Sequence, residues 1–362
     1  MHTALDGPDA WLGTDIAQSP VWVRDLAPTA LAEIDAALRA VQARGLPWQS
    51  ITRADFPLPS LDALFDDVAR ELERGCGMVK LRGVPVARYG EDELRQIYVG
   101  IATHVGRLLY QNRRGELMRD IRDEGADVGR RYGQVQTGTG GVFLSSYART
   151  LSNGALRFHT DRCDVVALLC VRRSRAGGVS KLASSVAVHN TILARRPDLL
   201  EVLFKDYHRS RFGEETGGER VAYALPLFGV RDRKFTSHYS RTYIESAQMI
   251  PGVPKLSAEQ IEALDLLDAV ADELSFGMTL EPGDIQFLNN HVIYHARTPF
   301  EDDAAAGQSR LLYRLWLWMP NSRPLPAGHE VLWRRIEPGV PRGGIGQEAA
   351  ATAGWDGPTA HA

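Results

Sequence analysis

The chain contains an unbroken apolar run at residues 165–171, with the sequence VVALLCV. A run of this length predicts a buried strand, which would hold the residues beside it on a rigid support. Just before this run stand His159 and Asp161, two residues apart on what we interpret as the edge of a strand. Side chains at positions i and i+2 of an extended chain point to the same face, so this imidazole and carboxylate can converge on one metal ion.

Neutral imidazole and carboxylate are the donors of the facial triad, in which two histidines and one carboxylate bind a non-haem Fe(II) and leave positions open. A His-x-Asp tripeptide also arises by chance in many proteins, so the pair needs a second histidine to predict a metal site. Two histidines, His291 and His295, share one face of a predicted strand at 285–295. The spacing alone does not choose between them.

The order of the predicted elements indicates the fold class. Amphipathic helices are predicted at 28–43, 60–74, 91–104, 185–204 with a break near Pro197, and 257–274, and strands at 78–85, 165–171, 285–295 and 310–318. Helices and one strand come first, and many short strands with helical insertions follow. This order favours an α+β protein built on a β-sandwich or jelly roll. We expect one domain at 21–340, between a flexible arm at 1–20 and a flexible tail at 341–362.

The composition narrows the class of partner. A formal net charge of -3, with 44% hydrophobic and 24% charged residues, is ordinary for a globular protein and gives no basic surplus to bind nucleic acid. Three cysteines without CxxC spacing predict neither a disulfide framework nor a structural zinc site. We find no signal-peptide pattern and no apolar window of membrane length, so we expect a cytoplasmic protein without a membrane partner. The oligomeric state is not readable from these features.

Two arginines interrupt the last predicted strand. Arg310 and Arg314 stand four residues apart, and so share one face of a segment at 310–318 that is otherwise mostly apolar. A guanidinium that points into an interior is costly unless it meets an anion, and it is the natural bidentate partner of a carboxylate. The pattern therefore indicates an anion beside this strand.

Taken together, these motifs resemble the taurine dioxygenase and clavaminate synthase-like group of Fe(II)- and 2-oxoglutarate-dependent oxygenases. The resemblance rests on stretches that follow the family order: FHTD at 158–161, GGVS at 177–180, PGD at 282–284 leading to NNHVIYHART at 289–298, and RLLYR at 310–314. GMVKLRG at 77–83 also looks like the family's first core strand. The resemblance implies a clavaminate synthase-like fold, with a double-stranded β-helix (jelly-roll) core and flanking helices.

The resemblance also implies a ligand set and a cosubstrate site. His295 matches the family's distal histidine, which is followed by a small residue and an arginine, and further on by the arginine that holds 2-oxoglutarate. Fe(II) would then be bound by His159, Asp161 and His295. Arg310 would hold the far carboxylate of 2-oxoglutarate, helped by Ser180 at a position where the family often has Thr.

Other residues are predicted to line the substrate pocket or to support it. Arg314 matches a family position that contacts the acidic group of the substrate in several members. Gln111, Asn112 and Asn153 are candidate substrate-binding residues in irregular segments, which we expect to supply the pocket from about 108 to 157 and from about 206 to 245. His291 is then interpreted as a packed or supporting histidine.

The implied function is an oxygenase that acts on a small molecule with O2 and converts 2-oxoglutarate to succinate and CO2. Related halogenases lack the carboxylate ligand, so the intact Asp161 argues for hydroxylation of an unactivated C–H bond, with desaturation, epoxidation and cyclisation left open. The competing hypotheses are a catalytically silent jelly-roll protein that binds a metal or ligand, and a hydrolase with zinc at the same residues. Arg310 and Ser180 argue against the hydrolase, since hydrolysis has no need of a dicarboxylate clamp.

Overall fold

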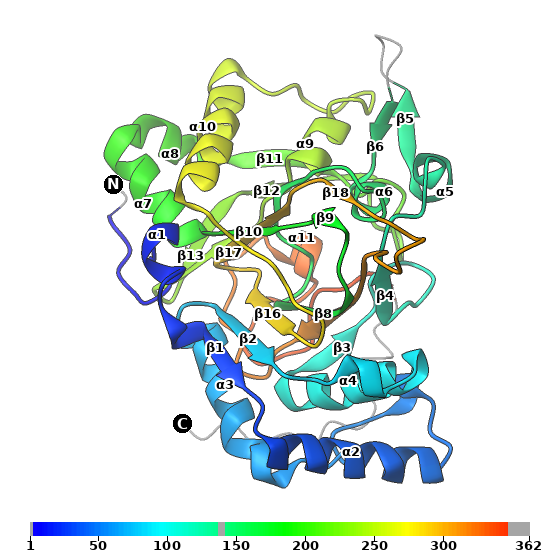
Figure 1. The fold of residues 1–362 in the computed structure, drawn as a ribbon. Helices are drawn as coiled ribbons and strands as arrows, with labels where there is room; N and C mark the ends of the chain where they lie inside the picture. The colour runs from blue at the N-terminus through cyan, green and yellow to red at the C-terminus, as the bar shows by residue number, and fades with distance from the viewer. Residues whose placement is uncertain (1–2, 137–141, 347–362) are drawn as a thin grey trace.

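Two β-sheets form the centre of the computed structural model, which describes residues 3–136 and 142–346 (Figure 1). The larger sheet has the order β1-β2-β16-β8-β19-β3, and β4 pairs with β19 as well. Its strands are β1 (Val23–Asp25), β2 (Met78–Arg82), β3 (Arg107–Leu109), β4 (Met118–Ile121), β8 (Val165–Arg172), β16 (Ile285–Asn289) and β19 (Leu311–Trp318). The smaller sheet has the order β15-β10-β17-β7. Its strands are β7 (Leu156–His159), β10 (Ser180–Ser184), β15 (Phe276–Met278) and β17 (Ile293–Arg297).

Alternation along β8 and β19 divides the larger sheet into two faces. The odd-numbered residues of both strands, such as Val165 and Leu315, pack with helices α2 (Pro28–Ala43), α3 (Asp62–Arg74) and α4 (Glu91–Val105). The even-numbered residues, such as Val166 and Trp316, belong to a second core cluster together with residues of the smaller sheet. The space between the sheets is therefore lined by the even-numbered side chains of β8 and β19.

Helices cover the outer sides of both sheets. Helices α2, α3 and α4 lie along the larger sheet, and α7 (Ser185–Arg195), α8 (Pro197–Leu203) and α10 (Ala258–Leu274) lie beside the smaller one (Figure 1). The remaining described helices are α1 (Gly13–Ile16), α5 (Val128–Tyr132), α6 (Ser146–Thr150), α9 (Arg241–Ala247), α11 (Glu330–Trp333), and the 3-10 turns η1 (Pro20–Trp22), η2 (Trp48–Ser50), η3 (Pro59–Leu61) and η4 (Val86–Arg88).

The remaining described strands form pairs: β5 (Gln134–Gln136) with β6 (Val142–Leu144), β9 (Ala176–Gly177) with β18 (Phe300–Glu301), β11 (Asp206–Ser210) with β12 (Ala222–Pro226), and β13 (Phe228–Arg231) with β14 (Lys234–Ser237).

The helices predicted from periodicity are confirmed, and so is the mixed α+β class. The predicted strand at 285–295 is wrong, because it is two strands in different sheets, β16 and β17. Asn289 causes the break: its side-chain oxygen accepts the His291 amide at 2.9 Å, and its carbonyl accepts the Val292 amide at 3.2 Å. These bonds form a turn that competes with the strand ladder.

Both predicted flexible ends pack on the domain where they are described. Trp11 is 8% exposed and its indole N–H donates to the Cys76 carbonyl, while the Leu5 amide donates to the Asn190 side chain. Near the other end, Arg342 is 2% and Ile345 is 4% exposed. Residues 5–16 and 342–346 therefore belong to the packed structure, and the rest of the predicted tail, 347–362, lies outside the described residues. Among the described helices, none has the length and apolar character needed to cross a bilayer.

Candidate metal centre

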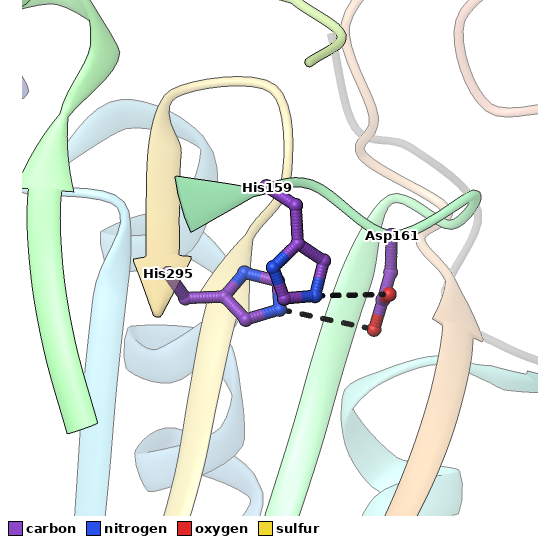
Figure 2. Close-up of side chains that lie close together, drawn as sticks. All are labelled: His159, Asp161 and His295. Carbon is purple, nitrogen blue, oxygen red and sulfur yellow. Dashed lines mark ion pairs between the residues drawn. The ribbon is translucent and has the colours of Figure 1, made fainter. Parts of the chain in front are cut away.

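His159, Asp161 and His295 converge at one end of the smaller sheet (Figure 2). His159 ends β7 and is the register partner of His295 on the neighbouring strand β17. Asp161 lies two residues past the end of β7, rather than on the strand as the sequence suggests. Its two oxygens stand 3.8 Å from His159 Nε2 and 3.9 Å from His295 Nε2, and one ligand atom from each residue lies within 4.8 Å of the others.

Local hydrogen bonds orient the three side chains. His159 Nδ1 donates to the Arg157 carbonyl at 2.8 Å, which leaves Nε2 as the lone-pair nitrogen that faces Asp161. The Asp161 backbone amide donates to the Asn290 side chain, and the Trp316 indole N–H donates to Asp161 Oδ2, both at 2.9 Å. The Asn290 contact therefore fixes the Asp161 backbone, and the Trp316 contact orients its carboxylate, whose oxygens face the imidazoles.

Burial and charge keep these groups in the form that binds a metal. Burial, reinforced by His159, lowers the pKa of His295 to about 3, and burial also lowers the pKa of His159. Burial opposes ionisation of Asp161, yet nearby Arg314, the two histidines and the Trp316 N–H hold the pKa of this carboxyl below its usual value. Two neutral imidazoles and one carboxylate result, which is the donor set of a divalent metal site with open positions. The residues present thus fit a ferrous ion.

A first cavity, of about 520 Å³ including its mouth, extends from the triad between the two sheets. Arg310 and Ser180 line it together with apolar residues of both sheets, including Val166, Leu168 and Leu182. A largely apolar cavity with a guanidinium and a hydroxyl among its lining residues has the chemistry to hold a small molecule with an acidic end.

Arg310 is the buried cation of this first cavity. Its side chain is 7% exposed, and burial lowers the pKa of its guanidinium to about 10. The guanidinium stacks on Phe300 at 5.2 Å, and within the described residues its Nη1 atom has no hydrogen-bond partner. No described acid forms an ion pair with it. A buried cation with an unsatisfied donor is costly, so its position indicates an anionic ligand.

A second cavity, of about 670 Å³ including its mouth, opens on the other side of the triad. Arg314 lines both cavities and donates through Nε to Gln111 Oε1 at 2.7 Å, while its Nη1 lies 3.6 Å from Asp161 Oδ2. Gln111 also lines the second cavity and donates to the Arg314 carbonyl at 2.8 Å. The predicted pair therefore stands between the metal centre and the second cavity.

Two of the predicted substrate residues lie elsewhere. Asn112 donates to Glu116 at 2.7 Å and its side-chain oxygen accepts the Arg114 amide, so it shapes a turn. Asn153 precedes β7, and its carbonyl accepts the Phe300 amide. Within the described residues, neither belongs to the lining of the two cavities, so the structure does not support a place in the substrate pocket for either. A loop Asn is more often a turn former than a ligand contact.

The second cavity has lining residues that the sequence did not single out. They come from the two irregular segments predicted to supply the pocket and from the C-terminal segment: Ser146, Tyr147, Thr150, Ser210, Arg211, Glu214, Tyr223, His238, Tyr243, Leu332 and Ile345. Arg162, which directly follows Asp161, lines it as well. Its place beside the metal ligand was the one signal in the sequence that could have identified it.

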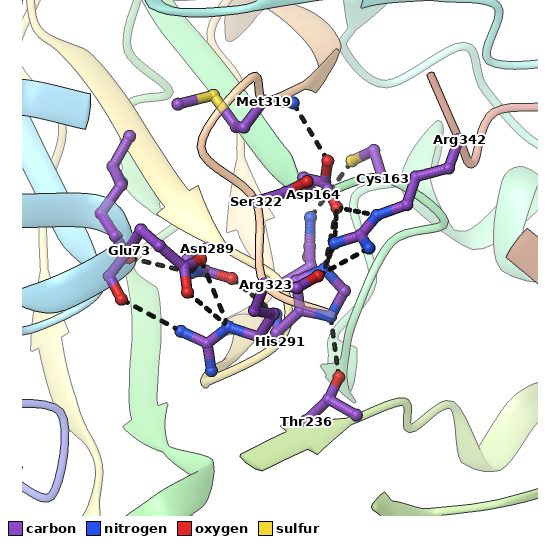
Figure 3. Close-up of polar contacts among 12 residues, drawn as sticks. Glu73, Cys163, Asp164, Thr236, Asn289, His291, Met319, Ser322, Arg323 and Arg342 are labelled. Carbon is purple, nitrogen blue, oxygen red and sulfur yellow. Dashed lines mark hydrogen bonds and ion pairs between the residues drawn. The ribbon is translucent and has the colours of Figure 1, made fainter. Parts of the chain in front are cut away.

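His291 lies apart from the metal centre, in a buried polar network (Figure 3). Its Nε2 atom bonds Asp164 Oδ1 at 2.9 Å, and its Nδ1 atom bonds the Thr236 hydroxyl at 2.8 Å. Arg342 reaches the same Asp164 oxygen at 2.8 Å, and the Met319 amide donates to the other oxygen. This network fastens the C-terminal segment to the strand that follows the metal ligands, in line with the supporting role predicted for His291.

The chain has clear relatives. The family model described as "Taurine catabolism dioxygenase TauD, TfdA family" matches residues 41–316. FR-33289 synthase of Streptomyces rubellomurinus is 30% identical over 331 residues, which cover 89% of this chain and 92% of that protein. Taurine hydroxylase-like protein SAT17 of Stachybotrys chartarum is 30% identical over 344 residues, which cover 93% of this chain and 83% of that protein.

The fold has solved counterparts. The crystal structure of asparagine oxygenase in complex with Fe(II), 2S,3S-3-hydroxyasparagine and succinate matches with a TM-score of 0.61 at 15% identity. The match covers 82% of this chain and 93% of that chain. At this level of identity, the likeness concerns the fold alone.

Proposed function

The chain belongs to the TauD, TfdA family and is a non-haem iron, 2-oxoglutarate-dependent oxygenase, and we propose that it hydroxylates an unactivated C–H bond of a small molecule. The intact carboxylate Asp161 supports hydroxylation over halogenation, because it would bind the metal where a halogenase needs room for a halide. Both full-length relatives have synthase or hydroxylase names, which is consistent with an oxidation in small-molecule metabolism.

We infer that the two sheets are the halves of the predicted double-stranded β-helix. All strand pairs within these sheets except β1 with β2 are antiparallel. The first cavity is lined by Val166 and Leu168 from the larger sheet and by Leu182 and His295 from the smaller one, so the sheets face each other across it. This arrangement supports a jelly-roll core with the metal centre at one end.

His159, Asp161 and His295 would hold Fe(II), which would use O2 as the oxidant and 2-oxoglutarate as the sacrificial reductant to oxidise an unactivated C–H bond. The protein itself orients the metal ligands and limits the access of water to them. The Arg157 carbonyl keeps the His159 lone pair on Nε2, and the Trp316 N–H keeps one Asp161 oxygen in place. Both contacts fix the ligands before the metal arrives.

Arg310 and Ser180, which both line the first cavity, would bind the far carboxylate of 2-oxoglutarate. The guanidinium is pre-positioned by Phe300, and it has no internal acid to displace among the described residues. The substrate would enter through the second cavity, which reaches His159 and Asp161 from the other side. His159 and Asp161 are themselves buried, at 9% and 8% exposed, which limits the access of water to the reacting groups.

One observation carries the proposal: the triad stands between two cavities, and one of them is lined by a buried arginine that has no acid partner among the described residues. A hydrolytic metal site needs no such cation. A silent binding protein could keep it, so turnover has to be measured.

The test begins with the protein loaded with Fe(II) under argon and titrated with 2-oxoglutarate. We expect a visible charge-transfer band, which reports chelation of the metal by the keto acid. His295→Ala should lose this band, while His208→Ala, a histidine on β11 that lines neither cavity, should keep it. Admission of O2 with a panel of small acidic metabolites should then give succinate. A normal band without succinate for any substrate would favour the silent binding protein.

A further inference from the structure

Two buried guanidiniums line the second cavity beside the metal centre. Arg162 follows the ligand Asp161, and Arg211 follows β11. Arg162 is 8% and Arg211 is 5% exposed. Neither is part of the triad or of the arginines on β19 that the family resemblance explains. The family resemblance therefore does not account for these two buried cations.

Backbone carbonyls hold both guanidiniums in position. Arg162 Nε donates to the Leu332 carbonyl at 2.9 Å, and Arg211 Nη2 donates to the Val331 carbonyl at 2.6 Å. Arg211 Nε also donates to the Arg220 carbonyl, and its guanidinium stacks on Tyr223 at 4.5 Å. Neutral carbonyls fix the direction of a guanidinium but do not neutralise its charge.

A single carboxylate serves both cations. Glu219 Oε1 lies 2.9 Å from Arg162 Nη2 and 3.5 Å from Arg211 Nη1. Its other oxygen accepts the Thr216 amide. Within the described residues, Arg211 Nη1 is buried without a hydrogen-bond partner. Burial, and then the charge of Arg162, lower the pKa of Arg211, as expected for two cations that share one anion.

We propose that Arg162 and Arg211 form a binding site for an oxyanion of the substrate, a carboxylate, sulfonate or phosphonate, in the cavity that leads to the metal centre. This inference rests on the proposed function, because it assigns the cavity to the substrate. An oxyanion there would supply the second negative charge that the pair lacks and an acceptor for Arg211 Nη1. The same cavity reaches His159 and Asp161, so one molecule can place its acidic end here and a C–H bond beside the metal.

The other charged groups of the cavity favour an anion as well. Arg314 contributes a third guanidinium, whose described partner Asp161 is a candidate metal ligand. Glu214 is the opposing acid, but burial raises its pKa to about 7, so at neutral pH it is only partly ionised. The cavity therefore carries a cationic excess.

The test measures binding of propane-1-sulfonate to the protein loaded with Fe(II) and 2-oxoglutarate under argon, by calorimetry. A sulfonate is a poor ligand for iron and does not titrate near neutral pH, and bound 2-oxoglutarate blocks Arg310. Methyl propyl sulfone, which is neutral, and propylamine, which is cationic, are the matched control probes. We expect saturable binding of the sulfonate and at least tenfold weaker binding of both controls.

The variants change the charge of the site in opposite directions. Arg211→Gln and Arg162→Gln should each weaken sulfonate binding about tenfold or more. Glu219→Gln keeps the shape of the side chain and removes the shared anion, so it should strengthen sulfonate binding severalfold. This gain does not depend on whether the arginine variants remain well packed.

The 2-oxoglutarate charge-transfer band distinguishes a failure of the oxyanion site from a failure of the proposed function. If the band is normal but the sulfonate fails to bind, or binds equally to the arginine variants, the oxyanion site is refuted while the proposed oxygenase stands. Tighter binding of propylamine than of the sulfonate would also refute it, and would assign the cavity to a cation opposite Glu214. Loss of the band in the unmodified protein would refute the proposed function itself.

Discussion

The Trp316 indole N–H donates to Asp161 Oδ2 at 2.9 Å and so ties the larger sheet to a candidate metal ligand. Trp316 faces inward because it has the even-numbered parity of β19, which it shares with Arg314. The hydrogen bond polarises and orients the carboxylate that a metal ion would share.

Replacement of this indole donor should weaken metal binding without unfolding the protein. In Trp316→Phe the ring packing is largely kept, but Asp161 Oδ2 loses its hydrogen bond. Loss of such a contact behind a metal ligand costs about tenfold to 100-fold in affinity. We expect an Fe(II) dissociation constant raised by about tenfold in an anaerobic competition titration. Trp48→Phe, a half-buried tryptophan in the helical cluster, is the control, and equal affinities in both variants would contradict this role for Trp316.

Removal of the Arg310 guanidinium should affect the cosubstrate and not the metal. Arg310→Ala should raise the 2-oxoglutarate concentration needed for the charge-transfer band by on the order of 100-fold, because a charge-assisted bidentate contact is lost. Arg310→Lys should recover part of the affinity. Arg195→Ala, which breaks an exposed ion pair with Glu273, should change nothing. Unchanged 2-oxoglutarate affinity in Arg310→Ala would remove this residue from the cosubstrate site.

The charge of Glu214 should make oxyanion binding depend on pH. Burial raises the pKa of Glu214 to about 7, so this carboxyl gains its negative charge as the pH rises from 6 to 8. Affinity for propane-1-sulfonate should therefore fall over this interval, by roughly fivefold for one added charge at close range. Glu214→Gln should abolish the pH dependence and give the high affinity throughout. A dependence that persists in this variant would have another origin.

The neighbours of Glu214 whose pKa is shifted by burial are two tyrosines and one histidine, and all three shifts favour the neutral form near pH 7. The charged and titratable groups that face it are Arg162, Arg314, Asp161, Glu215, Tyr223 and Tyr243. Burial raises the pKa of both tyrosines, so they stay neutral. Burial lowers the pKa of His238, which also lines the cavity, far below its usual value, so it stays neutral too.

The Asp164 network should be required for stability. Arg342→Met leaves the buried carboxylate of Asp164 with only His291 and the Met319 amide, and loss of one partner of a buried ion pair costs about 3 kcal/mol or more. The free energy of unfolding in urea would measure this. The same substitution at the exposed pair, Arg195→Met, should cost less than about 1 kcal/mol. Equal costs would mean that the buried pair contributes no more than a surface one.

The packing of the C-terminal segment, residues 320–346, could not be predicted from local sequence patterns. Residues past 320 lack periodicity, and the tail was predicted as flexible, yet Leu332 and Ile345 line the second cavity. Trp333 is 1% exposed and packs beside His291 at 4.9 Å. These contacts join residues far apart along the chain, and no local repeat encodes them.

The sequence by itself determined the helices, the buried strand at 165–171, the donor types His159 and Asp161, and the presence of arginines on the last strand, because periodicity and side-chain chemistry are local properties. Spacing alone left His291 and His295 equivalent and the family resemblance selected His295, whereas the tertiary structure supplies the physical reason, since a turn at Asn289 moves the chain from one sheet to the other and places His295 beside that pair. Only the tertiary structure made Arg162 and Arg211 share one carboxylate, because burial and counter-charge depend on which distant segments meet.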